Sequence, residues 1–137
     1  MMYNISYIKE LRQKCREQNM WAPAAFWNES LKKLRSYYNG VGAESWSVKF
    51  RDVVTNILCN FETSALIHDW EFSAPDSKKS YKTFITANIR FFINSICESY
   101  HSDFSFCKKI KIIIMGLFLA LLCQLFGWSN YSPKNKS

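Results

Sequence analysis

A nearly unbroken apolar run near the end of the chain restricts the fold more than any other feature. It extends from Ile112 to Trp128, and Gln124 is its one polar interruption. A helix of this length would be about 25 Å long, slightly shorter than the hydrocarbon layer of a bilayer, which is about 30 Å thick. A helix that is apolar on every side must be enclosed by protein or by lipid. The sequence therefore predicts a hydrophobic C-terminal helix that is either a core helix or a membrane-associated one.

The residues that flank this run fit both placements. Lys108, Lys109 and Lys111 precede it, and Trp128 and Tyr131 stand at its other end. Basic and aromatic residues are the usual anchors of a helix at the two interfaces of a membrane. The shortness of the run and its glutamine favour a core helix instead. We therefore assign residues 108–137 to a hydrophobic helix with a basic tail, and both placements stay open.

The remainder of the chain is predicted to be all-α. The 137 residues include only 4 glycines and 3 prolines, which disfavours a turn-rich β fold. Apolar residues recur at helical spacing in four segments, 4–18, 28–38, 45–72 and 80–100. Pro23, the sequence NGVG at 39–42 and the segment 73–79 separate them. We expect a small helical domain over residues 1–107.

Charge and cysteine content indicate which class of partner and which cellular compartment suit the protein. The net charge of +7 suits an anionic partner, either a lipid or membrane surface, a nucleic acid or an acidic protein. No nucleic-acid-binding motif is present, so that partner is disfavoured. The five cysteines are odd in number and form no CxxC pair, which predicts free thiols in a reducing compartment. With no secretory signal in the first residues, the predicted location is cytoplasmic, with membrane association through residues 112–128 as the alternative.

The sequence FETSALIHDWEF, at 61–72, carries an adjacent histidine and aspartate in an apolar helical stretch. Consecutive helical residues point about 100° apart, so His68 and Asp69 must serve different partners. Imidazole can act as a base, and a carboxylate can bind a hard metal ion. Upstream, Gly40 and Gly42 permit a loop whose carbonyl groups turn inward, as in many calcium sites.

Together these motifs resemble the phospholipase A2 superfamily, in particular its small phage and bacterial members. The resemblance covers residues 36–96 and includes NGVGAESW, FETSALIHDWEF and SKKSYKTFITANI. It implies two antiparallel core helices and a calcium-dependent attack of water on an ester. His68 would be the base, Asp69 a calcium ligand, and Asn39, Gly40 and Gly42 the loop that supplies carbonyl oxygens.

One departure from the family pattern affects the chemistry. Where the family has an aspartate that holds the second imidazole nitrogen, this chain has Tyr81, which brings no negative charge. Asn88, two turns along the same helical face, is a second candidate for that place, again without charge. The resemblance therefore implies a diverged or catalytically impaired protein at a membrane surface, with His68 and Tyr81 as the catalytic candidates. The alternative is a non-enzymatic module that binds a host protein. In that case His68 bonds a hydroxyl such as that of Tyr81, and Asp69 bonds amides of the glycine loop.

Overall fold

The structure is a computed structural model that describes residues 3–38, 60–73 and 79–131. The described residues form helices and no strand, which confirms the predicted all-α class. In chain order the helices are α1 (Ile5–Glu17), α2 (Ala24–Asn28), α3 (Leu31–Tyr37), α5 (Glu62–Ser73), α6 (Tyr81–Tyr100), α7 (Phe106–Phe126) and α8 (Trp128–Tyr131).

Side-chain caps fix where these helices begin. The side-chain oxygen of Asn4 accepts a hydrogen bond from a backbone amide in the first turn of α1. The hydroxyls of Ser30, Ser80 and Ser105 cap α3, α6 and α7 in the same way. Three of the four segments predicted to be helical, 4–18, 28–38 and 80–100, are confirmed. The fourth is described only from residue 60, where α5 forms its end, and NGVG lies outside the described residues.

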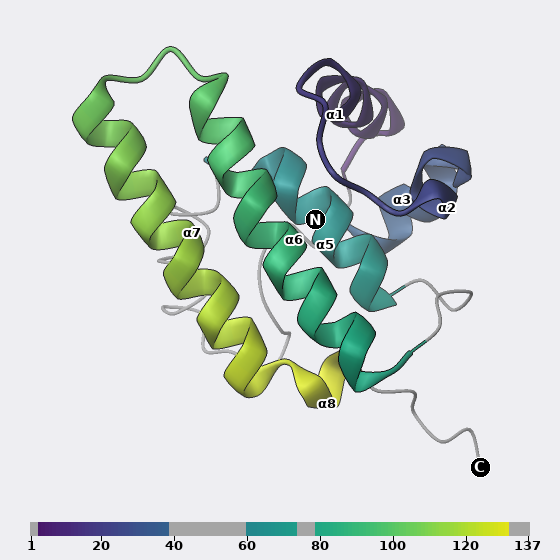
Figure 1. Cartoon of the computed structure of the whole chain (residues 1–137). Helices are drawn as coiled ribbons and strands as arrows, with labels where there is room; N and C mark the ends of the chain where they lie inside the picture. Colours follow the sequence, from purple (N-terminus) through teal and green to yellow (C-terminus); the bar gives the residue numbers. More distant parts are fainter. Residues whose placement is uncertain (1–2, 39–59, 74–78, 132–137) are drawn as a thin grey trace.

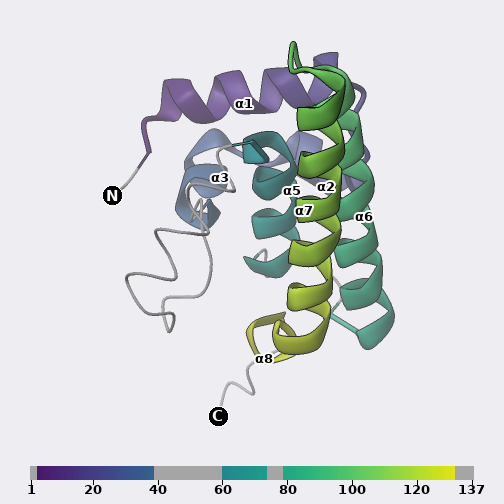
Figure 2. The ribbon, with the colours of Figure 1, turned by 90° about the vertical axis from the view of Figure 1, so that its left-hand side faces the viewer.

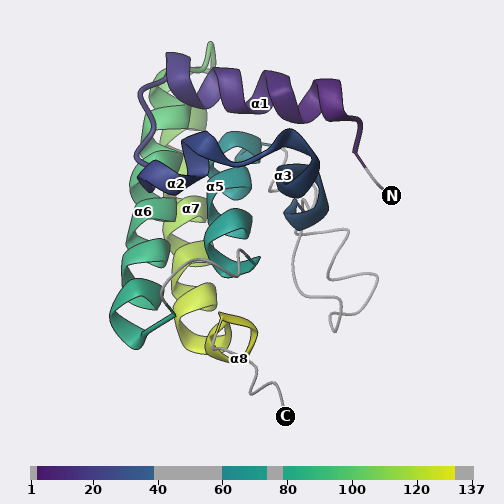
Figure 3. The ribbon, with the colours of Figure 1, turned by 90° about the vertical axis from the view of Figure 1, so that its right-hand side faces the viewer.

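Three helices form the body of the molecule. Figure 1 shows α5, α6 and α7 side by side, each running opposite to the one before it. Helix α6 packs against both of the others, so the predicted antiparallel pair is α5 and α6. Figure 2 shows α1 across one end of these helices and α8 at the opposite end, and Figure 3 shows α3 beside α5.

Helix α5 lies at the centre, between two apolar clusters. On one side Leu66, Ile67 and Trp70 pack against side chains of α1, α2 and α3. On the other side, Phe61, which directly precedes α5, packs against Phe91 of α6 and against side chains of α7. Because both sides are covered, α5 is buried around almost its whole circumference.

Charged side chains hold both ends of α5. At its N-terminus the carboxylate of Glu98, on α6, accepts hydrogen bonds from the backbone amides of Thr63 and Ser64 and from the Ser64 hydroxyl. At its C-terminus Nζ of Lys79 donates to the carbonyl oxygens of Glu71 and Phe72. An acid at the N-terminus and a base at the C-terminus complement the helix dipole, so the position of α5 is well defined.

The described part of the chain encloses the hydrophobic helix α7 on one side only. Its buried residues, Ile112, Gly116, Leu119 and Ala120, recur at helical spacing and face α6 and Phe61. Its other side is exposed. The helix begins at Phe106, six residues before the apolar run, and so includes the three lysines. By length and composition it could cross a membrane, and no other described helix could.

Candidate functional site

The imidazole of His68 lies inside the molecule. Only 9% of the residue is exposed. Its ring packs against the rings of Phe72 and Phe91, with centroid distances of 4.2 and 5.1 Å. Phe72 follows one helical turn after His68 on α5, while Phe91 comes from α6, so both helices shape this pocket. The candidate base therefore sits in an aromatic environment between the two core helices.

A chain of hydrogen bonds leads from this imidazole to the surface. Nε2 of His68 lies 3.0 Å from Oδ1 of Asn88, and Nδ2 of Asn88 donates to Oε1 of Gln124 at 2.9 Å. Nε2 of Gln124 donates in turn to the hydroxyl of Tyr81 at 3.4 Å. We call these four residues the polar chain. Because each amide accepts on one side and donates on the other, the chain requires the tautomer of His68 that carries its proton on Nε2.

Burial weakens His68 as a base. Loss of hydration lowers its pKa from 6.5 to about 4, and the hydrogen bond with Asn88 opposes this shift only in part. The imidazole is therefore neutral at pH 7. General-base catalysis is most effective when the pKa of the base lies near the working pH, so a base of this pKa is poorly matched to neutral solution.

The structure corrects the prediction that Tyr81 would bond the imidazole. Tyr81 is the first residue of α6 and is 57% exposed, and its hydroxyl accepts from Gln124. Asn88, two helical turns further along α6, is the side chain on the imidazole. Seven residues of helix correspond to about 10 Å along the axis, so Tyr81 lies too near the end of α6 to replace Asn88.

Of the predicted calcium ligands, the structure describes Asp69 alone. Asn39, Gly40 and Gly42 lie outside the described residues, as does the predicted contact of Asp69 with their amides. Burial raises the pKa of the Tyr3 and Tyr38 phenols, and the charges of Glu62 and Asp69 raise both further, so Asp69 lies within electrostatic range of the start of α1 and the end of α3. Within the described segments no three His, Cys, Asp or Glu side chains come together as a metal site. No second carboxylate, imidazole or thiolate group therefore joins Asp69 in a cluster of that kind there.

Gln124 is the one member of the polar chain that the sequence does not mark as a site residue, whereas Asn88 is marked as a neutral substitute for the missing carboxylate. Gln124 was read only as an interruption of the apolar run, and its role is to join α7 to α6 through Asn88 and Tyr81. The signal was present, since a lone amide in an apolar helix needs a hydrogen-bonding partner. Asn88 shared a helical face with Tyr81, but only the stagger of α5 against α6 decides which of them meets His68.

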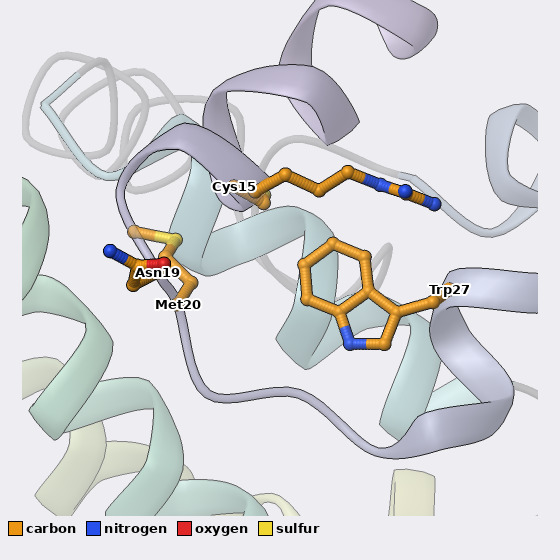
Figure 4. A pocket seen from close by; sticks show the side chains of 5 residues that line it. Cys15, Asn19, Met20 and Trp27 are labelled. Carbon is orange, nitrogen blue, oxygen red and sulfur yellow. The ribbon is translucent and has the colours of Figure 1, made fainter.

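A separate hollow of about 400 Å³ opens between the end of α1 and α2. Figure 4 shows Cys15, Asn19, Met20 and Trp27 around it. The one nucleophile there is Cys15, which is fully buried, and burial raises the pKa of its thiol to about 12. Because the thiolate is the reactive form, this thiol is inert at neutral pH. The hollow therefore offers no reactive group.

The cysteines agree with the prediction of free thiols where the structure describes them. Cys15, Cys97, Cys107 and Cys123 carry free thiols, and Cys59 lies outside the described residues. Burial raises the pKa of Cys123 to about 12, with a contribution from the charge of Asp69. Cys15 is therefore a packing group of α1, Cys97 and Cys123 are partly buried, and Cys107 is exposed at the start of α7.

Comparison with known proteins adds no relative to this description. No protein-family model, curated protein or solved structure matches the chain. The chemistry of the site must therefore be judged from the contacts of its own residues.

Proposed function

We propose that the protein is a diverged phospholipase A2-like protein that acts at a membrane surface without hydrolysing lipid. In this proposal His68 is a neutral, hydrogen-bonded member of the helical core. The observation that carries it is the contact of His68 with Asn88, an amide, at the nitrogen where the resemblance implies a carboxylate. Helix α7 and the net charge of +7 support the location at a membrane.

The missing negative charge beside His68 and the burial of its ring both oppose hydrolysis. A base that takes a proton from water becomes an imidazolium, and a neighbouring carboxylate stabilises that cation. An amide orients the ring but provides no such stabilisation, and in serine proteases the equivalent change costs about 10⁴ in rate. Burial adds to this loss, because a cation between Phe72 and Phe91 would be poorly hydrated. The same features make a neutral His68 a stable core residue.

Calcium-dependent turnover of a fluorescent phospholipid tests this proposal. We expect the wild-type protein and the His68→Gln variant to give equal, background rates over a calcium titration. The Asn88→Asp variant provides a sharper comparison, because it places a carboxylate on Nε2 of His68. We expect no gain in turnover, because the imidazole stays buried between Phe72 and Phe91, and a gain would show that this charge alone separates the protein from a hydrolase. Calcium-dependent turnover that His68→Gln abolishes would show that His68 is a catalytic base and would refute the proposal.

A further inference from the structure

We propose that one face of the α6–α7 pair lies flat against an anionic lipid bilayer, with its apolar side chains among the acyl chains. This inference rests on the proposed function, which places the protein at a membrane, and adds the surface that makes contact and the orientation. We call this surface the outer face. It consists of the exposed apolar side chains of α6 and α7, beginning with Ile89, Ile93 and Ile96 of α6.

The contribution of α6 is a stripe at helical spacing. Ile89, Ile93 and Ile96 are separated by four and three residues, so they lie on one side of the helix. The opposite side carries Phe84 and Phe91, which are buried against α5 and α8. An exposed stripe of isoleucines is unfavourable in water, since each side chain loses the free energy it would gain on burial.

Helix α7 continues this stripe over a greater length. Ile110, Ile114, Leu117, Leu121 and Leu125 are all exposed and recur every three or four residues, and Leu125 is 71% exposed. They lie on the side opposite Ile112, Gly116 and Leu119, which face the other helices. The exposed side of α7 is therefore as apolar as its buried side.

The two stripes form one continuous face. Figure 1 shows α6 and α7 side by side, and Figures 2 and 3 show both at one side of the molecule, with α5 next to them on the inner side. Because α5 packs on the inner side of α6, and Phe61 directly before α5 packs against α7 on that same side, the two exposed stripes point away from α5 together. The outer face thus belongs to two helices of 20 and 21 residues that lie side by side.

The charges around the outer face identify its occupant as anionic lipid. Between Phe104 and Tyr131, where the structure describes the chain, there are three lysines and no acidic residue. Lys108 and Lys111 are exposed at the start of α7, beside the apolar stripe. A protein interface of this size would also need hydrogen-bonding groups on the face. An apolar face bordered by lysines matches the boundary between acyl chains and anionic headgroups.

The contacts on the inner side require α7 to lie along the membrane. Gln124 forms a hydrogen bond with Asn88. A Cβ added at Gly116 would lie 2.4 Å from Oγ of Ser95, so α7 packs closely against α6. If α7 crossed the bilayer, α6 would be drawn in with it, together with the ion pair of Arg90 and Glu71. Moving such groups into hydrocarbon is costly, whereas a helix pair that lies flat keeps them in water.

Sedimentation with lipid vesicles tests the inference. The wild-type chain is mixed with vesicles of phosphatidylcholine alone, or of phosphatidylcholine with phosphatidylglycerol, and we expect stronger binding to the second. Ile93→Glu on α6 and Leu117→Glu on α7 should each weaken binding by about tenfold or more. The matched control is Ile5→Glu, at an exposed position of α1, which should bind within about twofold of wild type. Thermal melts confirm that each variant is folded.

The results of this experiment distinguish failure of the outer-face inference from failure of the proposed function. If the wild type binds vesicles but neither glutamate variant weakens binding, the outer face is the wrong surface and the proposed function stands. If the wild type binds neither kind of vesicle, the membrane role in the proposed function fails as well. An effect of Leu117→Glu alone, with binding that resists carbonate, would mean that α7 crosses the bilayer. A stable dimer that both variants dissociate without a change in vesicle binding would assign the outer face to a second copy of the chain.

Discussion

Helices α5 and α7 differ in a way that composition does not predict. Helix α5 contains a histidine, an aspartate and two glutamates, yet it is buried around most of its circumference. Helix α7 has no charged residue after Lys111, yet one complete side of it is exposed. Position in the fold explains the difference, because α5 lies between two layers and α7 lies at an edge. Ser64 and His68 of α5 find hydrogen-bonding partners inside the protein, whereas the exposed apolar groups of α7 are free for the proposed contact with lipid.

The largest expected effect is the difference in stability loss between two leucine-to-alanine substitutions, one on α5 and one on α7. Leu66→Ala on α5 removes a fully buried side chain and should lower the free energy of unfolding by about 2–5 kcal/mol. Leu125→Ala on α7 removes an exposed one and should change it by less than about 0.5 kcal/mol in lipid-free buffer. Chemical denaturation measures both. Equal losses would mean that the outer side of α7 is covered within the protein itself.

A second test uses the buried imidazole of α5. Its folded-state pKa of about 4 lies below the value of 6.5 expected in the unfolded chain, so the unfolded state binds more protons between these pH values. The stability that His68 contributes is fully present above pH 6.5 and is lost as pH falls toward 4. The shift corresponds to about 3 kcal/mol. Unfolding free energies measured in steps over this range give the slope.

The His68→Gln variant serves as the control for this titration. It removes the titrating group but keeps a side chain that can donate to Asn88, so the difference between wild type and variant isolates the histidine from all other groups. We expect the advantage of the wild type to shrink steadily from pH 6.5 to 4. A difference that stays constant with pH would mean that the imidazole is hydrated, and the buried polar chain would then be wrong.

The close approach of α7 to α6 allows a third, smaller test. Gly116→Ala places a methyl group 2.4 Å from Oγ and 3.0 Å from Cβ of Ser95, and such overpacking should cost about 1–3 kcal/mol. Adding Ser95→Ala removes the nearer atom and should recover part of this loss. A double-mutant cycle measures the coupling of the two positions. Additive effects would show that the two helices are free to separate at this point.

The smallest effect is expected at the end of α5. Lys79→Met removes two hydrogen bonds to the carbonyl groups of Glu71 and Phe72, but it also removes a cation whose partial burial lowers its pKa to about 8. These contributions oppose each other, so the net loss of stability should be about 1 kcal/mol or less. Lys82→Met, at an exposed neighbouring position, is the control, and a thermal melt compares the two. A loss of several kcal/mol would show that Lys79 is essential to the fold.

Local chemistry made the helices predictable from the sequence. Asn4, Ser30 and Ser80 are capping residues, and apolar residues at helical spacing follow each of them. Helix geometry alone predicts that the side chains of His68 and Asp69 point in different directions. It does not predict the partner of His68, because choosing Asn88 over Tyr81 requires the axial position of α6 against α5. The exposure of one side of α7 was equally out of reach, since periodicity cannot show a buried side in a helix that is apolar all round.

Methyl NMR in lipid bicelles tests the central claim, contact of the outer face with lipid, most directly. Isoleucine methyl groups occur in matched positions: Ile93 and Ile114 on the outer face, Ile5 exposed on α1, and Ile67 buried on α5. With a spin-labelled lipid in the acyl layer, we predict that the signals of Ile93 and Ile114 broaden while those of Ile5 and Ile67 stay sharp. Sharp signals for Ile93 and Ile114 in the bicelle-bound protein would contradict the account.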